Sequence, residues 1–510
     1  MGRITNYESS LYKQFEELNN KMDCLLKENK NLKSEHKKEI KKITKTFKTE
    51  ISELNNTVKD LNKKLDEANK LNQNLQNEID RLKNKNNKNS TNSSKPSSTN
   101  ITTPKKKTGA NLYNYRVKTN NKVGGQLGHD GHNLNKKQIE DLIDNKKVDV
   151  RTIYHKINGK DNKQIVKYRL GIEIKPYVEK HIFDCGKNYK DILPKEFYTD
   201  VTYDNSIKSL SIELGAYNVV SYDRLSDFFS VISNNVINIS NGTLVNFLYE
   251  FSNKSERTIT NLEQNILNSI NVFTDETGTK FNKKNMYIRN YSNKNTVVYK
   301  AHKNKGHKPI LEDNILPNFY GGIMGDHDTT LYSYGTNNYE CNIHLGRYLE
   351  ELIQNVPDIS WPYKMKDLIF RMNNTKKIAI QYGLKKLSKN KIKEYETEFD
   401  NILKIAKEEN KHISSSFYKS KANTLCNRLE KYKDNHLYFV KDFDVSFDNN
   451  LSEQDLRMFK TKTKISGGFR SLKGAESFVN ALSIIKTSIK RNINPFDTIC
   501  KIFNNEVLFG

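Results

Sequence analysis

The residues of this chain with the clearest chemical potential are two aspartates that end strand-like runs. The run Val272-Phe273-Thr274 leads directly into Asp275, and the glycine-rich run that begins at Gly321 leads into Asp326. Neighbouring strands of one sheet would bring both carboxylates to a shared edge. Carboxylate oxygens are ligands that Mg²⁺ prefers. With a third carboxylate from elsewhere in the chain, such a pair is suited to metal-assisted phosphoryl transfer.

Two further acids, Glu276 and Asp328, lie beside the chosen pair. Because neighbouring side chains of a strand point to opposite faces, we expect one acid of each pair to face the metals. We expect Asp275 and Asp326 to do so, and Glu276 and Asp328 to be surface or support residues.

The elements that must position these acids follow from the apolar pattern. Three strands at hairpin spacing are predicted, then a short helix, then a further strand. This order is typical of a ribonuclease-H-like α/β core. The predicted segments are Val272–Gly278, Met286–Arg289, Thr296–Tyr299, the helix Pro309–Asn314 and the strand Gly321–Gly325.

The composition indicates a polyanionic partner. The 510 residues include 85 Lys and Arg against 60 Asp and Glu, a formal charge of +25, and nucleic acid is the commonest partner of so basic a chain, with an anionic membrane surface next. No apolar run approaches the roughly 18 residues that span a bilayer, and the N-terminus lacks a signal-peptide core. Five scattered cysteines suit a reducing cytoplasm.

A heptad stripe predicts a coiled coil over residues 1–84. Apolar residues recur in steps of three and four, as in Leu54, Val58, Leu61 and Leu65, which keeps them on one face of a helix roughly 110 Å long. A helix cannot bury such a stripe alone, so pairing with a second copy of the chain is expected. A lone charged helix is the alternative.

A basic linker is predicted over residues 85–122. From Asn84 to Lys122 the sequence carries nine basic residues and no acidic one, so it cannot form a core. It could slide along phosphates, or it could merely keep the chain in solution.

Residues 123–250 are predicted to form a region that binds DNA ends. It begins with the glycine-rich loop Gly124–His132 and continues with strand-like segments at Gln164–Tyr168 and Val178–Phe183. In the helical part that follows, Ile239–Asn246 resembles the second half of a helix-turn-helix, with Ser240 as the N-cap. A plain helical hairpin explains the same pattern.

A series of motifs in fixed order resembles the insertion-sequence 66 (IS 66) family of DDE transposases. The resemblance spans roughly residues 122–502, and the leading coiled coil fits the same architecture. The motifs are Gly124–His132, Ile239–Asn246, Thr274–Thr277, Asp326–Thr329 with Leu331-Tyr332, Glu340–His344, Asn449–Arg457 and Lys464–Arg470.

The resemblance implies a catalytic and metal-binding triad of Asp275, Asp326 and Glu453, with Asp448 as the fallback for the third acid. The gap between Asp326 and Glu453 is too long for a bare ribonuclease-H-like core. We therefore expect a multidomain α+β fold, with the first part of the core at residues 265–344, a helical insertion at 345–445, and the C-terminal core helices at 446–510. Glu453 is then placed in the first turn of a helix.

Basic residues directly after the third acid are predicted to bind DNA phosphates beside the scissile bond, although a solvated charged face is the alternative. They are Arg457, Lys460, Lys462, Lys464, Arg470 and Lys473. His327 and His344 are predicted to support the site as hydrogen-bond donors, or to be ordinary structural histidines.

Two Mg²⁺ or Mn²⁺ ions are the expected cofactors. Zinc is not expected, because Cys341 and His344 supply only two ligands and the chain has no CxxC pair, whereas structural zinc usually takes four.

The function that this implies is transposition: cleavage and strand transfer at the ends of an insertion sequence. The expected partners are element ends and target DNA, a second copy of the chain, and accessory proteins of the same element, with no membrane. A bacterial, cytoplasmic, nucleoid-associated location follows. The alternatives are an inactive DNA-binding relic of a transposase, a coiled-coil interaction protein, and a nuclease that only hydrolyses.

Overall fold

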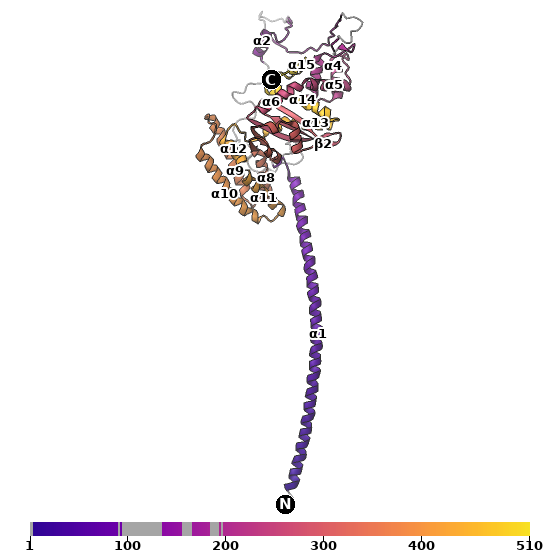
Figure 1. Ribbon diagram of the computed structural model, residues 1–510, viewed down its shortest axis with the longest axis vertical. Helices are drawn as coiled ribbons and strands as arrows, with labels where there is room; N and C mark the ends of the chain where they lie inside the picture. The colour runs from indigo at the N-terminus through magenta and orange to yellow at the C-terminus, as the bar shows by residue number, and fades with distance from the viewer. Residues whose placement is uncertain (1–3, 90–91, 94–134, 156–165, 184–192, 195–196) are drawn as a thin grey trace. The chain divides into compact units, whose positions relative to one another are not determined.

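The computed structural model describes most of the chain, as two compact units (Figure 1). One unit comprises residues 1–87 with 414–419, and the other comprises residues 88–413 and 420–510. The loop Gly124–His132 and most of the predicted linker lie outside the described residues. These residues are 4–89, 92–93, 135–155, 166–183, 193–194 and 197–510.

The first unit is built on one long helix, α1 (Ile4–Asn87), of 84 residues. No part of the chain that the structure describes covers its apolar stripe, with Leu54 63% and Leu61 58% exposed. The predicted helix is confirmed, whereas its pairing with a second copy stays a prediction. No helix of the described residues is long and apolar enough to cross a membrane.

The second unit is organised around a mixed five-stranded sheet with the order β3-β2-β1-β4-β5. β2 runs antiparallel to both β1 and β3, whereas β4 runs parallel to β1 and β5 parallel to β4. The four strands predicted between Val272 and Gly325 are confirmed, and β5 is an addition that the sequence analysis missed. The bounds are β1 (Asn271–Phe281), β2 (Lys284–Ser292), β3 (Val297–His302), β4 (Gly322–Gly325) and β5 (Asn337–Glu340).

A tight turn makes β1 and β2 one long hairpin. Its two central residues, Asn282 and Lys283, both have left-handed backbones, with φ of 44° and 65°. A two-residue turn of this kind matches the right-handed twist of the strands that it joins. The hairpin therefore carries β1 well past Asp275, to Phe281.

Helices cover the sheet and complete the main core. α13 (Asn450–Ser466) packs on β1 and β2, and α14 (Leu472–Lys490) packs on β3. Leu456 and Phe459 of α13 and Phe478 of α14 join the buried core of the sheet. Further elements pack against α14 or β3: the π-helical turn η4 (Glu213–Tyr217), α5 (Asn241–Lys254), α6 (Glu256–Leu267) and α15 (Pro495–Phe503). The helix α3 (Asn205–Ile212) packs against α5 and α15.

The predicted helical sequence between Asp326 and Glu453 is confirmed as helix. Trp361 is fully buried in this part of the chain, and α9 packs against both α8 and α10 (Figure 1). The bounds are α8 (Asn342–Asn355), α9 (Trp361–Gln381), α10 (Lys389–Glu409), α11 (Ser416–Lys431) and α12 (Lys433–Lys441).

The region before β1 differs from the prediction in one respect. Val178–Phe183 and the described part of Gln164–Tyr168 form no strand. Val178 is 93% exposed and Ile182 is 75% exposed. The apolar side chains of this alternating segment are therefore not packed against a core. The short helix α2 (Lys136–Asp144) precedes them.

The predicted cap at Ser240 is confirmed, because its side chain accepts the backbone N–H of Thr243. α5 pairs with α4 (Tyr222–Ile232) around a small core that includes Phe229 and Phe247. Whether this helical pair is a DNA-reading motif stays a prediction.

Candidate active site

The two predicted aspartates lie on adjacent central strands at matching heights. β1 and β4 run parallel, and Phe273 is the register partner of Met324. Each of these residues stands two positions before its aspartate, so Asp275 and Asp326 are level across the pair. Asp326 directly follows β4, as predicted, but Asp275 lies in the middle of β1 and not at a strand end, because the hairpin extends β1.

Glu453 lies in the first turn of α13, as predicted. Two side chains attach this helix start to the sheet. Asn449 Nδ2 donates to the carbonyl of Thr274 at 2.9 Å, and Ser452 Oγ donates to Oδ1 of Asn290 at 2.7 Å. The same oxygen of Asn290 accepts the backbone N–H of Asp275 at 3.0 Å. Sequence reasoning missed Asn290 and Ser452, since nothing in their spacing distinguishes them.

His344 lies between two of the predicted acids. Its Nδ1 is 3.0 Å from Asp326 Oδ1 and 3.6 Å from Glu453 Oε1. Its Nε2 is 2.9 Å from Nη1 of Arg347. Because a guanidinium can only donate, Nε2 must accept, and the ring proton belongs on Nδ1, facing the carboxylates. Burial lowers the pKa of His344 to about 3, so the ring is neutral.

The two aspartates feel the charges of the neighbouring acids. Burial, and to a smaller extent nearby Glu453, raises the pKa of Asp275 to about 6. Burial and Asp275 together raise the pKa of Asp326 to about 7. Lys460 and Arg428 oppose these increases. The sequence-predicted triad is therefore brought together, and its ionised forms repel one another.

Glu276 and Asp328, the acids beside Asp275 and Asp326, form ion pairs with cationic side chains. Arg289, only 2% exposed, pairs with Glu276 at 3.1 Å and with Asp328 at 3.3 Å. Lys305 adds a second cation, 3.0 Å from Glu276. Among the described residues no lysine or arginine forms such a pair with Asp275 or Asp326. This difference supports the division into facing and supporting acids, and Arg289 is a residue that the sequence analysis missed.

His327 faces away from the carboxylates, toward Glu340 at the end of β5. Its Nδ1 lies 2.7 Å from Glu340 Oε1, and Arg428 Nη2 donates to Oε2 at 2.8 Å. Burial alone would raise the pKa of Glu340, but the bond to His327 and its cationic surroundings lower it to about 2. Glu340 is therefore ionised. His327 itself has a left-handed backbone, with φ of 50°, and holds the turn after Asp326.

The six predicted DNA-binding residues fall into three sets. Arg457, Lys460 and Lys464 follow Glu453 by 4, 7 and 11 positions, which is one helix face, and all three are exposed. Lys462 points elsewhere: its Nζ lies 5.2 Å from the Phe478 ring centre, and burial lowers its pKa. Beyond α13, Arg470 is exposed, and Lys473 lies over the Tyr249 ring at 4.6 Å.

A second donor set overlaps the triad. Donor atoms of Cys341, His344 and Glu453 all lie within 4.8 Å of one another. A soft metal there would need a thiolate and a bare ring nitrogen. Burial raises the pKa of Cys341 far above its usual range, and the Arg347 bond leaves the Nδ1 of His344 protonated.

A hard cation fits the carboxylates better. Asp326 Oδ1 is buried and lacks a well-directed hydrogen bond, despite its nearness to His344. An oxygen in this state is suited to metal ligation.

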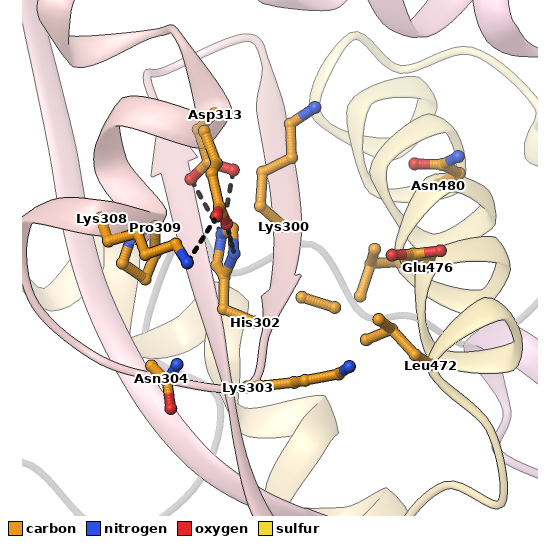
Figure 2. Close-up of a pocket in the computed structure, with 13 residues that line it drawn as sticks. Lys300, His302, Lys303, Asn304, Lys308, Pro309, Asp313, Leu472, Glu476 and Asn480 are labelled. Carbon is orange, nitrogen blue, oxygen red and sulfur yellow. Dashed lines mark hydrogen bonds and ion pairs between the residues drawn. The ribbon is translucent and has the colours of Figure 1, made fainter.

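A pocket of about 620 Å³ lies elsewhere, between β3, α14 and the helix α7 (His307–Asp313). Figure 2 shows His302 pointing at Asp313, with Nε2 2.9 Å from a carboxylate oxygen. Among the described residues, no Ser, Thr or Cys lines this pocket, so the His-Asp pair has no hydroxyl or thiol nucleophile to activate. None of the triad lines it either, and we do not include it in the site.

Comparison with known families decides the identity. The model of the Transposase IS66 family matches residues 203–477, more than half of the chain. The chain belongs to the IS66 transposase family. No curated protein matches it. The matched range of this IS66-family transposase contains the sheet, the helical sequence after β5, and Asp275, Asp326 and Glu453, whereas α1 and α15 lie outside. The resemblance predicted over residues 122–502 is thus confirmed for 203–477.

Proposed function

We propose that this chain is an active DDE transposase that cleaves DNA at the ends of an insertion sequence and joins them to target DNA. The observation that carries the proposal is the convergence of Asp275, Asp326 and Glu453. They come from β1, from the end of β4 and from the start of α13, and they lie close enough for Glu453 to raise the pKa of Asp275, and for Asp275 and Glu453 to raise the pKa of Asp326.

The sheet supports a ribonuclease-H-like core. Three antiparallel strands are followed by two strands parallel to the first, in the order 3-2-1-4-5. Such an arrangement places the two aspartates on adjacent strands. A helix that packs on these strands supplies the third acid. Residues 342–441 would then be the insertion that separates the last helix from the sheet.

Asp275, Asp326 and Glu453 would hold two Mg²⁺ or Mn²⁺ ions. When bound, the ions would activate water and stabilise the leaving oxygen. Around them, the His344 ring would lie against Asp326 and Glu453, while Asn290 fixes the strand against the helix. Arg457, Lys460 and Lys464, on the Glu453 face of α13, would bind the flanking phosphates.

The reaction has two balanced displacements. Water attacks the phosphorus at the element end, the bond to the 3′ oxygen breaks, and the products are a 5′-phosphate and a 3′-hydroxyl. That hydroxyl then attacks a target phosphodiester, forms a new bond to its phosphorus and releases a target 3′-hydroxyl. No covalent protein intermediate is required.

The decisive experiment compares the wild type with Asp275→Asn and Glu453→Gln on DNA that carries the element ends, with Mg²⁺ or Mn²⁺. We expect both variants to lose roughly 100-fold or more in cleavage and joining. Asp448→Asn is the matched control, because Asp448 only accepts the backbone N–H of Asn450 at 3.1 Å. Activity lost in Asp448→Asn and kept in Glu453→Gln would move the third acid to Asp448.

The same assay separates the alternatives. DNA binding by the wild type without cleavage would favour an inactive relic or a missing accessory protein. Cleavage without joining would favour a nuclease. Failure to bind DNA at all would favour an interaction protein built on α1.

We also propose that α1 pairs with the α1 of a second copy. Its uncovered apolar stripe supports this, because a single helix leaves the stripe in water. Pairing would bring two element ends together, so that both are cut in one complex.

A further inference from the structure

The turn between α9 and α10 carries positive charge of a single sign. We define the basic hairpin as residues 376–393, the C-terminal end of α9, the turn and the start of α10. It contains seven lysines and no Asp or Glu. The lysines are Lys376, Lys377, Lys385, Lys386, Lys389, Lys391 and Lys393.

Five of these lysines have no acidic partner within the described residues. Lys376 is buried and donates to the carbonyl of Val445, and Lys391 pairs with Glu394 at 2.8 Å. The remaining five are exposed. Elsewhere in α10 the pattern is different, because Lys407 pairs with Glu430 and Asp400 pairs with Lys433 of α12. Among the described residues, no ion pair therefore relieves the mutual repulsion of these five lysines.

Exposed apolar side chains stand among these lysines. Tyr382 is 81% exposed, and Ile378, Ile380 and Leu384 are each about half exposed. A merely solvated charged turn has no need of them. Lysines interleaved with an exposed aromatic ring are the combination that binds nucleic acid, since the cations bind phosphates and the ring stacks on an unpaired base.

The hairpin is anchored to the segment that leads to the third acid. Leu387 N donates to the carbonyl of Val440 at 3.1 Å, and Phe443 N donates to the carbonyl of Lys385 at 2.9 Å. With the Lys376 bond to Val445, three bonds join the hairpin to residues 440–445. That segment continues into Asn449 and the start of α13. The basic hairpin is thus attached to the segment that leads along the chain to Glu453.

We propose that the basic hairpin is a second DNA-binding surface, separate from the basic face of α13. Lys377, Lys385, Lys386, Lys389 and Lys393 bind the phosphates of a duplex, and Tyr382 stacks on a base where the DNA is unpaired. The inference rests on the proposed function in taking DNA as the polyanion, but it does not depend on which acids are catalytic.

The test is a titration of a labelled DNA duplex with the full chain. Binding is measured by fluorescence anisotropy at salt concentrations between about 50 and 200 mM. The variant is Lys385→Gln/Lys386→Gln/Lys389→Gln. The control is Lys364→Gln/Lys404→Gln/Lys407→Gln, which removes the same charge from exposed positions of α9 and α10 outside the hairpin. We expect the hairpin variant to reduce the slope of log affinity against log salt by about 2 to 3, and the control to match the wild type.

Tyr382 is tested on the same duplex with a single-stranded extension. Tyr382→Ala should weaken binding to the extended DNA roughly 10-fold, as loss of one stacking contact does. Blunt duplex should bind unchanged, and Tyr382→Trp should keep the preference. A loss that is equal on both DNAs would overturn the stacking role.

The outcomes separate this inference from the proposed function. If the wild type binds DNA and the hairpin variant matches its control, the hairpin surface is wrong and the proposed function stands. If the wild type binds no DNA, both fall. Thermal melting of each variant shows whether a loss of binding is a loss of folding.

Discussion

The hydroxyl of Ser452 donates a 2.7 Å hydrogen bond to Oδ1 of Asn290, the same atom that accepts the backbone N–H of Asp275. Both side chains are completely buried. One amide oxygen therefore joins the strand that carries the first predicted acid to the helix that carries the third. The separation of Asp275 and Glu453 is held by this junction.

Removing the junction should lower activity more than stability. For Ser452→Ala we expect a loss of about 1 kcal/mol in the free energy of unfolding, since Asn290 keeps its bond to Asp275. Single-turnover cleavage should fall by roughly 100-fold, because small misplacements of reacting groups are costly. Urea unfolding and cleavage rates measure the two effects.

Ser452→Thr is the matched control for the junction, because it keeps the hydroxyl. If Ser452→Ala cleaves as fast as the wild type, the junction has no role in placing the acids. Activity that is kept in Ser452→Thr and lost in Ser452→Ala would assign the loss to the missing hydroxyl.

Binding of Mg²⁺ should depend on pH through Asp275 and Asp326. Both have a folded pKa, of about 6 and about 7, above the ordinary 3.8. Without metal, these groups stabilise the fold below pH 3.8, and this contribution is lost as the pH rises through 6 and 7. A cation that binds the two ionised carboxylates offsets this loss of stability at high pH. Mg²⁺ should therefore raise the melting temperature clearly near pH 8 and little near pH 5.

The double variant Asp275→Asn/Asp326→Asn provides the reference for that measurement. It should melt at the same temperature with and without Mg²⁺ at either pH. A rise in the melting temperature of the wild type that is independent of pH would show that the ion binds elsewhere.

Arg289 should be essential to the fold rather than to the reaction. Arg289→Met leaves Glu276, whose side chain is 7% exposed, with Lys305 alone. Breaking a buried pair from one side typically costs about 3 to 5 kcal/mol, and denaturant unfolding would measure the loss. Adding Glu276→Gln should recover part of it. If the double variant is no more stable than Arg289→Met, the pairing with Glu276 contributes little.

The apolar stripe of α1 should control the oligomeric state. In the full chain, Leu54→Gln/Leu61→Gln/Leu65→Gln keeps good helix formers but removes apolar contacts at the heptad positions. We expect a shift from dimer or higher species to monomer in light scattering after gel filtration. The control Lys59→Gln/Lys63→Gln/Glu67→Gln changes residues off the stripe and should leave the mass unchanged. A wild-type chain that is already monomeric would refute pairing.

The sequence predicted those parts of the fold that are set by strong local patterns. The heptads of α1, the apolar runs of β1 to β4 and the Ser240 cap each leave a local signal. β5 left none, because Asn337–Glu340 has a single apolar residue and gains its place by pairing with β4. Val178–Phe183 shows the opposite failure: its alternation is typical of a strand, but no partner strand lies beside it among the described residues.

In the candidate site, too, the residues with a local sequence signal were predicted and those without one were missed. Asp275, Asp326 and Glu453 were found from strand ends and motif order. Arg289, Asn290 and Ser452 were not, since each acts across a distance in sequence that only the folded sheet closes. Lys462 shows the limit of counting charges: it lies in the predicted basic run, but helical phase turns it toward Phe478.

The position of α13 in the chain also has a consequence during synthesis. Glu453 follows Asp275 by 178 residues, and translation at about 5 to 20 residues per second separates them by roughly 9 to 36 s. The strands with both aspartates and the basic hairpin have emerged before the third acid exists. Because α13 and α14 complete the core of the sheet, a product truncated before residue 450 would lack both the third predicted acid and the packing that holds the two aspartates in place.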